Sequence, residues 1–206
     1  NYFYSNEMPL GISGFMDVDA TNTFHHPDDP LKGNTYNAIH IVETYEGVNG
    51  NRNWEETDVP FVFTGDDYNM AIESGNSLTL APGVVVKFNS GIGIHADEGL
   101  LIAHGTPEKR IVFTSVHDDR FGGDTDNNGS TISPTAGDWS SIEVSGANNS
   151  SGFAYCDFYY GGGYSDYYDQ VLLIRSNNTT VDNCLFAYNK SERRGALHMG
   201  EAGTGS

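Results

Sequence analysis

Short runs in which apolar and polar residues alternate recur along the chain, and turn residues separate them. Eight such runs are VPFVF (59–63), SLTLAPGVVVKF (77–88), GIGIHA (91–96), LLIAHG (100–105), RIVFTS (110–115), SSIEVSG (140–146), QVLLIRS (170–176) and GALHMG (195–200). Alternation over a few residues is typical of a β-strand, and Gly, Pro, Asn and Asp at the borders indicate turns. The pattern predicts an all-β protein, which a sandwich or a barrel would also satisfy.

An internal repeat decides between these architectures. FAYCDFYYG (153–161) and VDNCLFAYN (181–189) share the pattern apolar-x-x-Cys-x-Phe. Cys184 follows Cys156 by 28 positions, and Phe186 follows Phe158 by the same 28. A period of this length with several short strands is the signature of a solenoid. Successive coils of a β-helix lie about 4.8 Å apart, so we expect each of these pairs to stack inside the tube.

The stacked cysteines have two interpretations. A free cysteine behaves as a small buried hydrophobe. A disulfide needs Cβ atoms about 3.8 Å apart, which is closer than an in-register stack provides. We therefore favour a ladder of free thiols over a disulfide.

The order of the parts resembles a known class. SLTLAPGVVVKFNSGIGIHADEGLLIAHGTPEKRIVFTS precedes an Asp/Gly-rich insert, GDWSSIEVSG and the Cys-x-Phe coils. This order, over about residues 59–206, resembles secreted bacterial and archaeal right-handed parallel β-helix proteins of the broad pectate-lyase-like class. The resemblance is weaker over 1–58, where a long polar loop near 13–37 reads as part of a coil. It implies one right-handed parallel β-helix domain over 1–206 and an extracellular or cell-surface location.

The fold implied by the resemblance does not specify one activity. Lyases, hydrolases, adhesins and structural filaments all use it, so function has to be argued from the site.

The charge balance restricts the partners. The chain carries 10 Lys+Arg against 28 Asp+Glu, a formal charge of −18. Nucleic acid is not expected as a partner, because phosphate binding needs a basic surface. Calcium is a natural partner of such a surface, and an acidic face that only maintains solubility is the alternative. No run of 18 apolar residues is present, so no membrane span is expected.

The acidic insert at 116–138 carries the clearest metal motif. Asp124, Asp126 and Asn128 are spaced at i, i+2 and i+4, and Gly129 follows them. This spacing directs oxygen ligands to one side of a tight turn. The closing Glu of an EF-hand is absent, so we expect a β-turn calcium loop that is closed by Asp118, Asp119 or Asp138. Hard oxygen ligands favour Ca²⁺ over Zn²⁺, and a solvated acidic loop is the alternative.

Catalysis requires acid and base groups that lie close together, and the sequence does not indicate a convincing set of them. A polysaccharide lyase needs a base and a cation, and a glycoside hydrolase needs two carboxylates about 5 to 9.5 Å apart. Lys87 lies in an alternating strand and is expected to point outward as an ordinary strand residue. We therefore expect a non-catalytic structural protein, with a polysaccharide lyase or glycoside hydrolase as the alternative.

A tyrosine-rich segment, DFYYGGGYSDYYDQ (157–170), suggests a contact surface. Its tyrosines are Tyr159, Tyr160, Tyr164, Tyr167 and Tyr168. Sugars and protein partners both use surfaces of this kind, and packing of the loop against its own coil is the alternative. A carbohydrate-binding adhesin that recognises polysaccharide is thus a further functional candidate.

The two ends of the chain look like parts of one coil. NYFYSN, at the start, aligns with CLFAYN (184–189), so that Phe3 falls on Phe186, and GALHMG reads as one more strand. Exposed coil edges invite another chain, and a contact of this type propagates into a filament. We expect copies to stack head-to-tail through Tyr2, Phe3, Phe186, Leu197 and Met199. The alternative is that the chain is a fragment of a longer β-helix.

Overall fold

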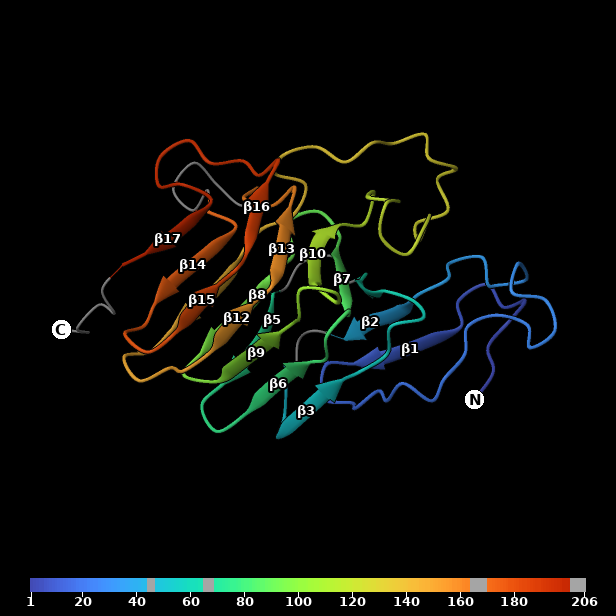
Figure 1. The fold of residues 1–206 in the computed structure, drawn as a ribbon, viewed down its shortest axis with the longest axis horizontal. Helices are drawn as coiled ribbons and strands as arrows, with labels where there is room; N and C mark the ends of the chain where they lie inside the picture. Colours follow the sequence, from blue (N-terminus) through green and yellow to red (C-terminus); the bar gives the residue numbers. More distant parts are fainter. Residues whose placement is uncertain (44–46, 65–68, 164–169, 201–206) are drawn as a thin grey trace.

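The computed structural model describes residues 1–43, 47–64, 69–163 and 170–200. In this part of the chain the regular elements are 17 β-strands, arranged in three sheets that wind along one axis (Figure 1). Every pairing between neighbouring strands of a sheet is parallel. The chain visits the sheets in turn and forms a solenoid of about seven turns. The predicted all-β parallel β-helix is confirmed, and the sandwich and barrel are excluded.

The three sheets differ in length. The seven-stranded sheet contains, in spatial order, β1 (Leu10–Ser13), β2 (Ile39–Glu43), β4 (Phe61–Phe63), β7 (Val85–Phe88), β10 (Ile111–Ser115), β13 (Cys156–Tyr159) and β16 (Leu185–Ala187). One five-stranded sheet contains β5 (Met70–Glu73), β8 (Ile94–Asp97), β11 (Ile142–Ser145), β14 (Leu172–Arg175) and β17 (Leu197–Met199). The other contains β3 (Asn51–Trp54), β6 (Ser77–Leu80), β9 (Leu100–His104), β12 (Gly152–Ala154) and β15 (Thr180–Asp182).

The predicted register between the last coils is confirmed. Phe158 on β13 pairs with Phe186 on β16, and their ring centroids are 4.7 Å apart with an interplanar angle of 2°. Phe113 on β10 stacks on the other face of Phe158 at 5.0 Å. Stacked pairs of this kind contribute about 0.5–1.5 kcal/mol beyond the apolar area that they bury. The ladder therefore fixes the register of the coils as well as filling the tube.

The pairing of β13 with β16 also aligns Cys156 with Cys184. Asp157 pairs with Leu185, so the residues immediately before them are neighbours. Both cysteines are free thiols; Cys156 is buried and Cys184 is partly exposed. The free-thiol ladder that the sequence favours is the state that the structure contains.

The first residues of the chain pair with the long polar loop predicted near 13–37. The backbone N–H of Phe3 donates to Thr23 O at 2.8 Å, and the N–H of Ser5 donates to Gly33 O at 2.9 Å. The ring of Phe3 stacks on that of Phe24 at 5.1 Å, and Phe24 is fully buried. The polar loop therefore packs as part of the β-helix instead of lying apart from it.

The insert at 116–138 connects β10 to β11 and carries no strand of its own. It crosses the outer face of the seven-stranded sheet, where Val116 packs with Ala38 and Val62. Gly122, at φ +73°, approaches Pro60 so closely that a Cβ atom there would lie 2.1 Å from Pro60 Cγ. A residue with a side chain would push the insert off the sheet at this point. The described residues contain no helix that is long and apolar enough to cross a membrane.

Candidate functional site

The candidate site lies where the insert covers the outer face of the seven-stranded sheet. The register aligns His40, Val62, Lys87 and Thr114 on consecutive strands. Their neighbours along each strand, apart from Ser115, belong to the apolar core, so these four side chains point away from it. All four are nevertheless buried, and Lys87 is 0% exposed. Lys87 thus points outward as expected, but it is not a surface residue, because the insert covers it.

Lys87 ties the sheet to the insert. Its Nζ donates to Gly123 O at 2.8 Å and to Thr125 Oγ1 at 3.1 Å. Burial lowers the pKa of Lys87 to about 8, although the nearby carboxylates of Asp119 and Asp118 favour its charged form. A largely charged ammonium therefore lies beneath the acidic insert at neutral pH.

Three carboxylates of the insert converge. Asp119, Asp124 and Asp126 each place one oxygen within 4.8 Å of the other two, and we call these residues the acidic cluster. Asp124 Oδ2 accepts from the backbone N–H of Gly129 at 2.8 Å. Asp119 Oδ2 accepts from the Ser130 hydroxyl, whereas Asp119 Oδ1 is buried without a hydrogen-bond partner. These are hard oxygen donors of the kind that Ca²⁺ takes.

Only some of the predicted calcium ligands enter this cluster. The Nδ2 of Asn128 donates to Asp126 at 2.7 Å, and its Oδ1 accepts from Thr131 N at 2.9 Å. Asp138 Oδ2 accepts from the Ser115 hydroxyl at 2.8 Å, and Asp118 is paired with Arg120. Asp118 and Asp138 therefore lie outside the acidic cluster, whereas Asn128 bonds to it through Asp126.

Hydrogen bonds keep Asp126 of the acidic cluster and Asp118 beside the cluster ionised. Burial opposes the ionisation of Asp126, but hydrogen bonds from His117 and Asn128 lower its pKa overall. Burial likewise opposes the ionisation of Asp118, and hydrogen bonds from Arg120 and Thr114 lower its pKa overall. Both aspartates therefore remain negatively charged well below neutral pH.

Arg120 lies at the centre of a group of aromatic rings. Its Nε and Nη2 donate to the two oxygens of Asp118 at 2.8 and 2.9 Å. Its guanidinium carbon lies 5.3, 4.8, 5.3 and 6.0 Å from the ring centroids of Phe121, Tyr159, Tyr160 and Tyr188, respectively. We call these five residues the Arg120 aromatic cluster. Distances below about 6 Å allow attraction between the cation and the ring faces.

A cleft separates the Arg120 aromatic cluster from the tip of the insert. Its volume is about 420 Å³, and Asp119, Ser130, Ile132 and Tyr160 are among the residues that line it. Tyr160 and Tyr188 stack at 5.6 Å, and Tyr188 is 65% exposed. This part of the surface combines open ring faces with polar groups.

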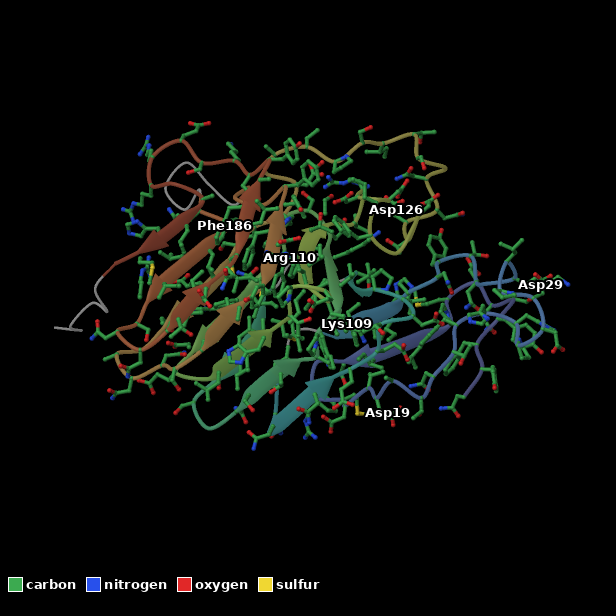
Figure 2. The ribbon with its side chains drawn as sticks, viewed as in Figure 1. Asp19, Asp29, Lys109, Arg110, Asp126 and Phe186 are labelled. Carbon is green, nitrogen blue, oxygen red and sulfur yellow. The ribbon has the colours of Figure 1, made fainter. Side chains whose placement is uncertain are left out.

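A second cleft lies beside the first on the same face of the sheet. Figure 2 labels Lys109 and Arg110, which line it together with Val85, Val112 and Phe121, and its volume is about 500 Å³. Arg110 Nε donates to Asp157 at 2.7 Å. This second cleft is mixed in charge, because Glu108 and Asp157 line it beside the two basic residues.

The predicted contact tyrosines are only partly covered by the described residues. Tyr159 and Tyr160 belong to the Arg120 aromatic cluster, and Tyr164, Tyr167 and Tyr168 lie outside the described residues. Sequence reasoning missed Tyr188, which follows Tyr160 by the same 28 positions as the Cys and Phe pairs. It also missed Phe121, for which the non-repeating insert offers no periodic signal.

The predicted stacking residues lie at opposite ends of the β-helix. Tyr2, 63% exposed, and Phe3 belong to the end that β1 closes. Phe186, Leu197 and Met199 lie on the last strands at the other end, where Met199 is 56% exposed (Figures 1 and 2). A hollow of about 320 Å³ at the first end is lined both by apolar side chains such as Phe3, Leu10 and Ile12 and by polar ones such as Asp17 and Asp19. Both ends thus present apolar groups near strand edges.

Comparison with known proteins adds no further assignment: no family model matches the chain, and no curated protein or solved structure is significantly similar to it.

Proposed function

We propose that this chain is a non-catalytic, extracellular structural β-helix of a cell surface, with an insert that calcium stabilises. The observation that carries the proposal is how the charged groups of the insert are used. Asp118 forms an ion pair with Arg120, Asp126 pairs with His117, and Lys87 donates a hydrogen bond to the backbone of the insert. These interactions hold the insert against the sheet. Catalytic acids and bases must instead be accessible to a substrate.

Calcium has a specific place in this proposal. Asp119, Asp124 and Asp126 are its protein ligands, and the orphaned Oδ1 of Asp119 supplies one of the oxygens. Lys87 offsets part of the negative charge of the cluster from below. Calcium binding then joins the two halves of the insert, because Asp119 precedes its Gly-rich turn and Asp124 and Asp126 follow it.

Self-association is the structural activity that we propose for the ends of the β-helix. Edge strands carry unpaired backbone groups, and the apolar side chains of Met199 and Leu197 lie beside the last edge. A second copy that brings Tyr2 and Phe3 against Phe186, Leu197 and Met199 continues both the strand pairing and the aromatic ladder.

The proposal is tested by imaging the purified protein by electron microscopy at increasing concentration. We expect end-to-end rods that shorten in the Met199→Asp variant, because a charge at the junction opposes burial. Leu31→Asp is the matched control, since Leu31 is 95% exposed on the polar loop. Monomers at all concentrations for the wild type, with calcium present, would contradict self-association.

The Arg120 aromatic cluster favours a second candidate function, which is contact with polysaccharide. The stacked rings of Tyr160 and Tyr188 provide an apolar platform beside hydroxyl and carboxylate groups, as sugar faces require.

Retention on immobilised neutral and acidic polysaccharides tests this second function. We expect Tyr188→Ala to weaken retention, with Tyr4→Ala as the control because Tyr4 is an exposed tyrosine at the other end of the molecule. Chain shortening of the polysaccharide during the assay would contradict the non-catalytic proposal and support a lyase or hydrolase.

A further inference from the structure

The two cysteines occupy equivalent positions in neighbouring turns. Each follows a residue in the left-handed region, Tyr155 at φ 50° and Asn183 at φ 52°. The same backbone conformation directs both side chains the same way, toward the inside of the tube. In-register parallel neighbours lie about 4.8 Å apart, which falls within the Cα separation of about 4.4–6.8 Å that disulfides use.

The two thiols are neighbours in the register of β13 with β16, because each directly precedes a paired residue. Their interaction raises the pKa of Cys156 and lowers the pKa of Cys184 to about 7. The two sulfurs make equivalent hydrogen bonds in successive turns. Cys156 Sγ donates to Ala103 O at 3.1 Å, Cys184 Sγ donates to Phe153 O at 3.6 Å, and Ala103 pairs with Phe153. Forming the S–S bond therefore requires the two Cβ atoms to move slightly closer than an in-register stack places them, to about 3.8 Å.

Arg110 holds the two turns together. Its Nη2 donates to Cys156 O at 3.3 Å and to Asn183 O at 2.8 Å. One guanidinium thus bonds to the backbone of both turns, next to the two cysteines. This clip limits the sliding of one turn against the other and keeps the sulfurs opposite each other.

We propose that Cys156 and Cys184 are an oxidisable pair that forms a disulfide between neighbouring turns and staples the last described turn to the one before it. The two cysteines differ in exposure, and this difference sets the order in which they react. Cys184 is partly exposed and reaches an oxidant first, whereas Cys156 is fully buried and reacts second.

The oxidant in this proposal is a small-molecule disulfide. The Cys184 thiolate attacks one of its sulfurs, a Cys184 mixed disulfide forms, and one small thiolate leaves. Cys156 loses its proton and attacks the Cys184 sulfur, which forms the protein disulfide and expels the second small thiolate. Two protein thiols are oxidised, one small disulfide is reduced to two thiols, and the two protons pass to them.

The staple reinforces the least supported turn. β15, β16 and β17 each have one strand neighbour within the described residues, and Leu185 and Met199 are exposed. Solenoid turns are held by their neighbours alone, so an end turn opens first. A covalent link at Cys184 resists that opening.

The experiment treats the folded full chain with oxidised glutathione and then counts thiols after unfolding. We expect the wild type to lose both thiols without retaining glutathione. In Cys156→Ser we expect a stable glutathione adduct at Cys184, and in Cys184→Ser we expect the buried Cys156 thiol to persist. Hydrogen exchange of residues 180–199 should slow at least about tenfold in the oxidised wild type and remain unchanged in both variants.

Two results would overturn the proposal. One is a wild type that keeps both thiols under conditions in which Cys156→Ser takes up glutathione. The other is a wild type that accumulates the Cys184 mixed disulfide without resolving it. Wild type unfolded in urea provides the control that the oxidant is active, because both thiols are then accessible.

Discussion

The two faces of the seven-stranded sheet are both buried at its centre, but by different means. The inner face is covered by side chains that stack from turn to turn, such as Phe63 on Phe88 and Phe113 on Phe158. The outer face carries His40, Lys87 and Thr114 beneath a single non-repeating insert. The inner face therefore depends on apolar packing, and the outer face depends on hydrogen bonds and charge. Mutations on the two faces should fail in different ways.

The largest effect is expected on the inner face. Phe158→Ala removes a fully buried ring that stacks between Phe113 and Phe186, and we expect a loss of about 3–5 kcal/mol in the free energy of unfolding. Phe186→Ala should cost markedly less, because Phe186 is partly exposed at the end of the ladder. Urea unfolding of both variants measures the difference, and equal losses would show that the ladder does not set stability.

On the outer face we expect a smaller effect on the free energy of unfolding, and this effect should disappear at acidic pH. Asp118→Asn replaces a buried carboxylate that accepts from Arg120 and Thr114, at a cost of about 1–3 kcal/mol. Because the folded pKa of Asp118 is lowered, its contribution is present above the unfolded pKa of about 3.9 and is lost as the pH falls through the folded pKa. Wild type and variant should therefore converge in acid, and a constant difference across the acid range would contradict this account.

The titration of Lys87 predicts a second pH-dependent change in stability, at alkaline pH. Its folded pKa of about 8 lies below the unfolded value of 10.5, so the unfolded chain binds more protons between these values and stability rises with pH there. Relative to Lys87→Met, the wild type should gain roughly 1–3 kcal/mol between pH 8 and 10.5. Comparing unfolding curves of the two proteins cancels the titration of other groups. Parallel pH profiles would show that Lys87 is not held beneath the insert.

The smallest effect is expected at the open edge of the outer face. Tyr188→Ala should change the free energy of unfolding by no more than about 0.5 kcal/mol, because the side chain is largely exposed. The same variant should still weaken retention on polysaccharide. A thermal shift and a retention assay on one sample separate these effects, and a large loss of stability would place Tyr188 in the fold instead of the contact surface.

The inner face was predictable because its signal is periodic. One repeat of 28 positions aligned Phe158 with Phe186 and Cys156 with Cys184, and the same period would have found Tyr188. The β-helix follows from that repeat, since stacked equivalents must face the same side of a coil.

The outer face was predictable only in part. The spacing of Asp124 and Asp126 predicts a turn that gathers oxygens, and in the structure their carboxylates lie together with that of Asp119. Asp118 and Asp138 were equally plausible ligands from the sequence, but Arg120 and Ser115 engage them. Which carboxylate is engaged depends on the path of the insert across the sheet, and no periodicity encodes that path.

The central claim is that calcium stabilises the insert as a cover over the outer face, and hydrogen exchange of residues 116–138 tests it most directly. Hydrogen exchange is compared between a sample with excess calcium and a sample with a chelator. Exchange in this segment should be slower with calcium, because a ligand that binds only the closed form stabilises it. Asp124→Asn should abolish the difference, and Asp28→Asn, an exposed aspartate on the polar loop, should preserve it. Identical exchange of the wild-type insert with calcium and with chelator would contradict the claim.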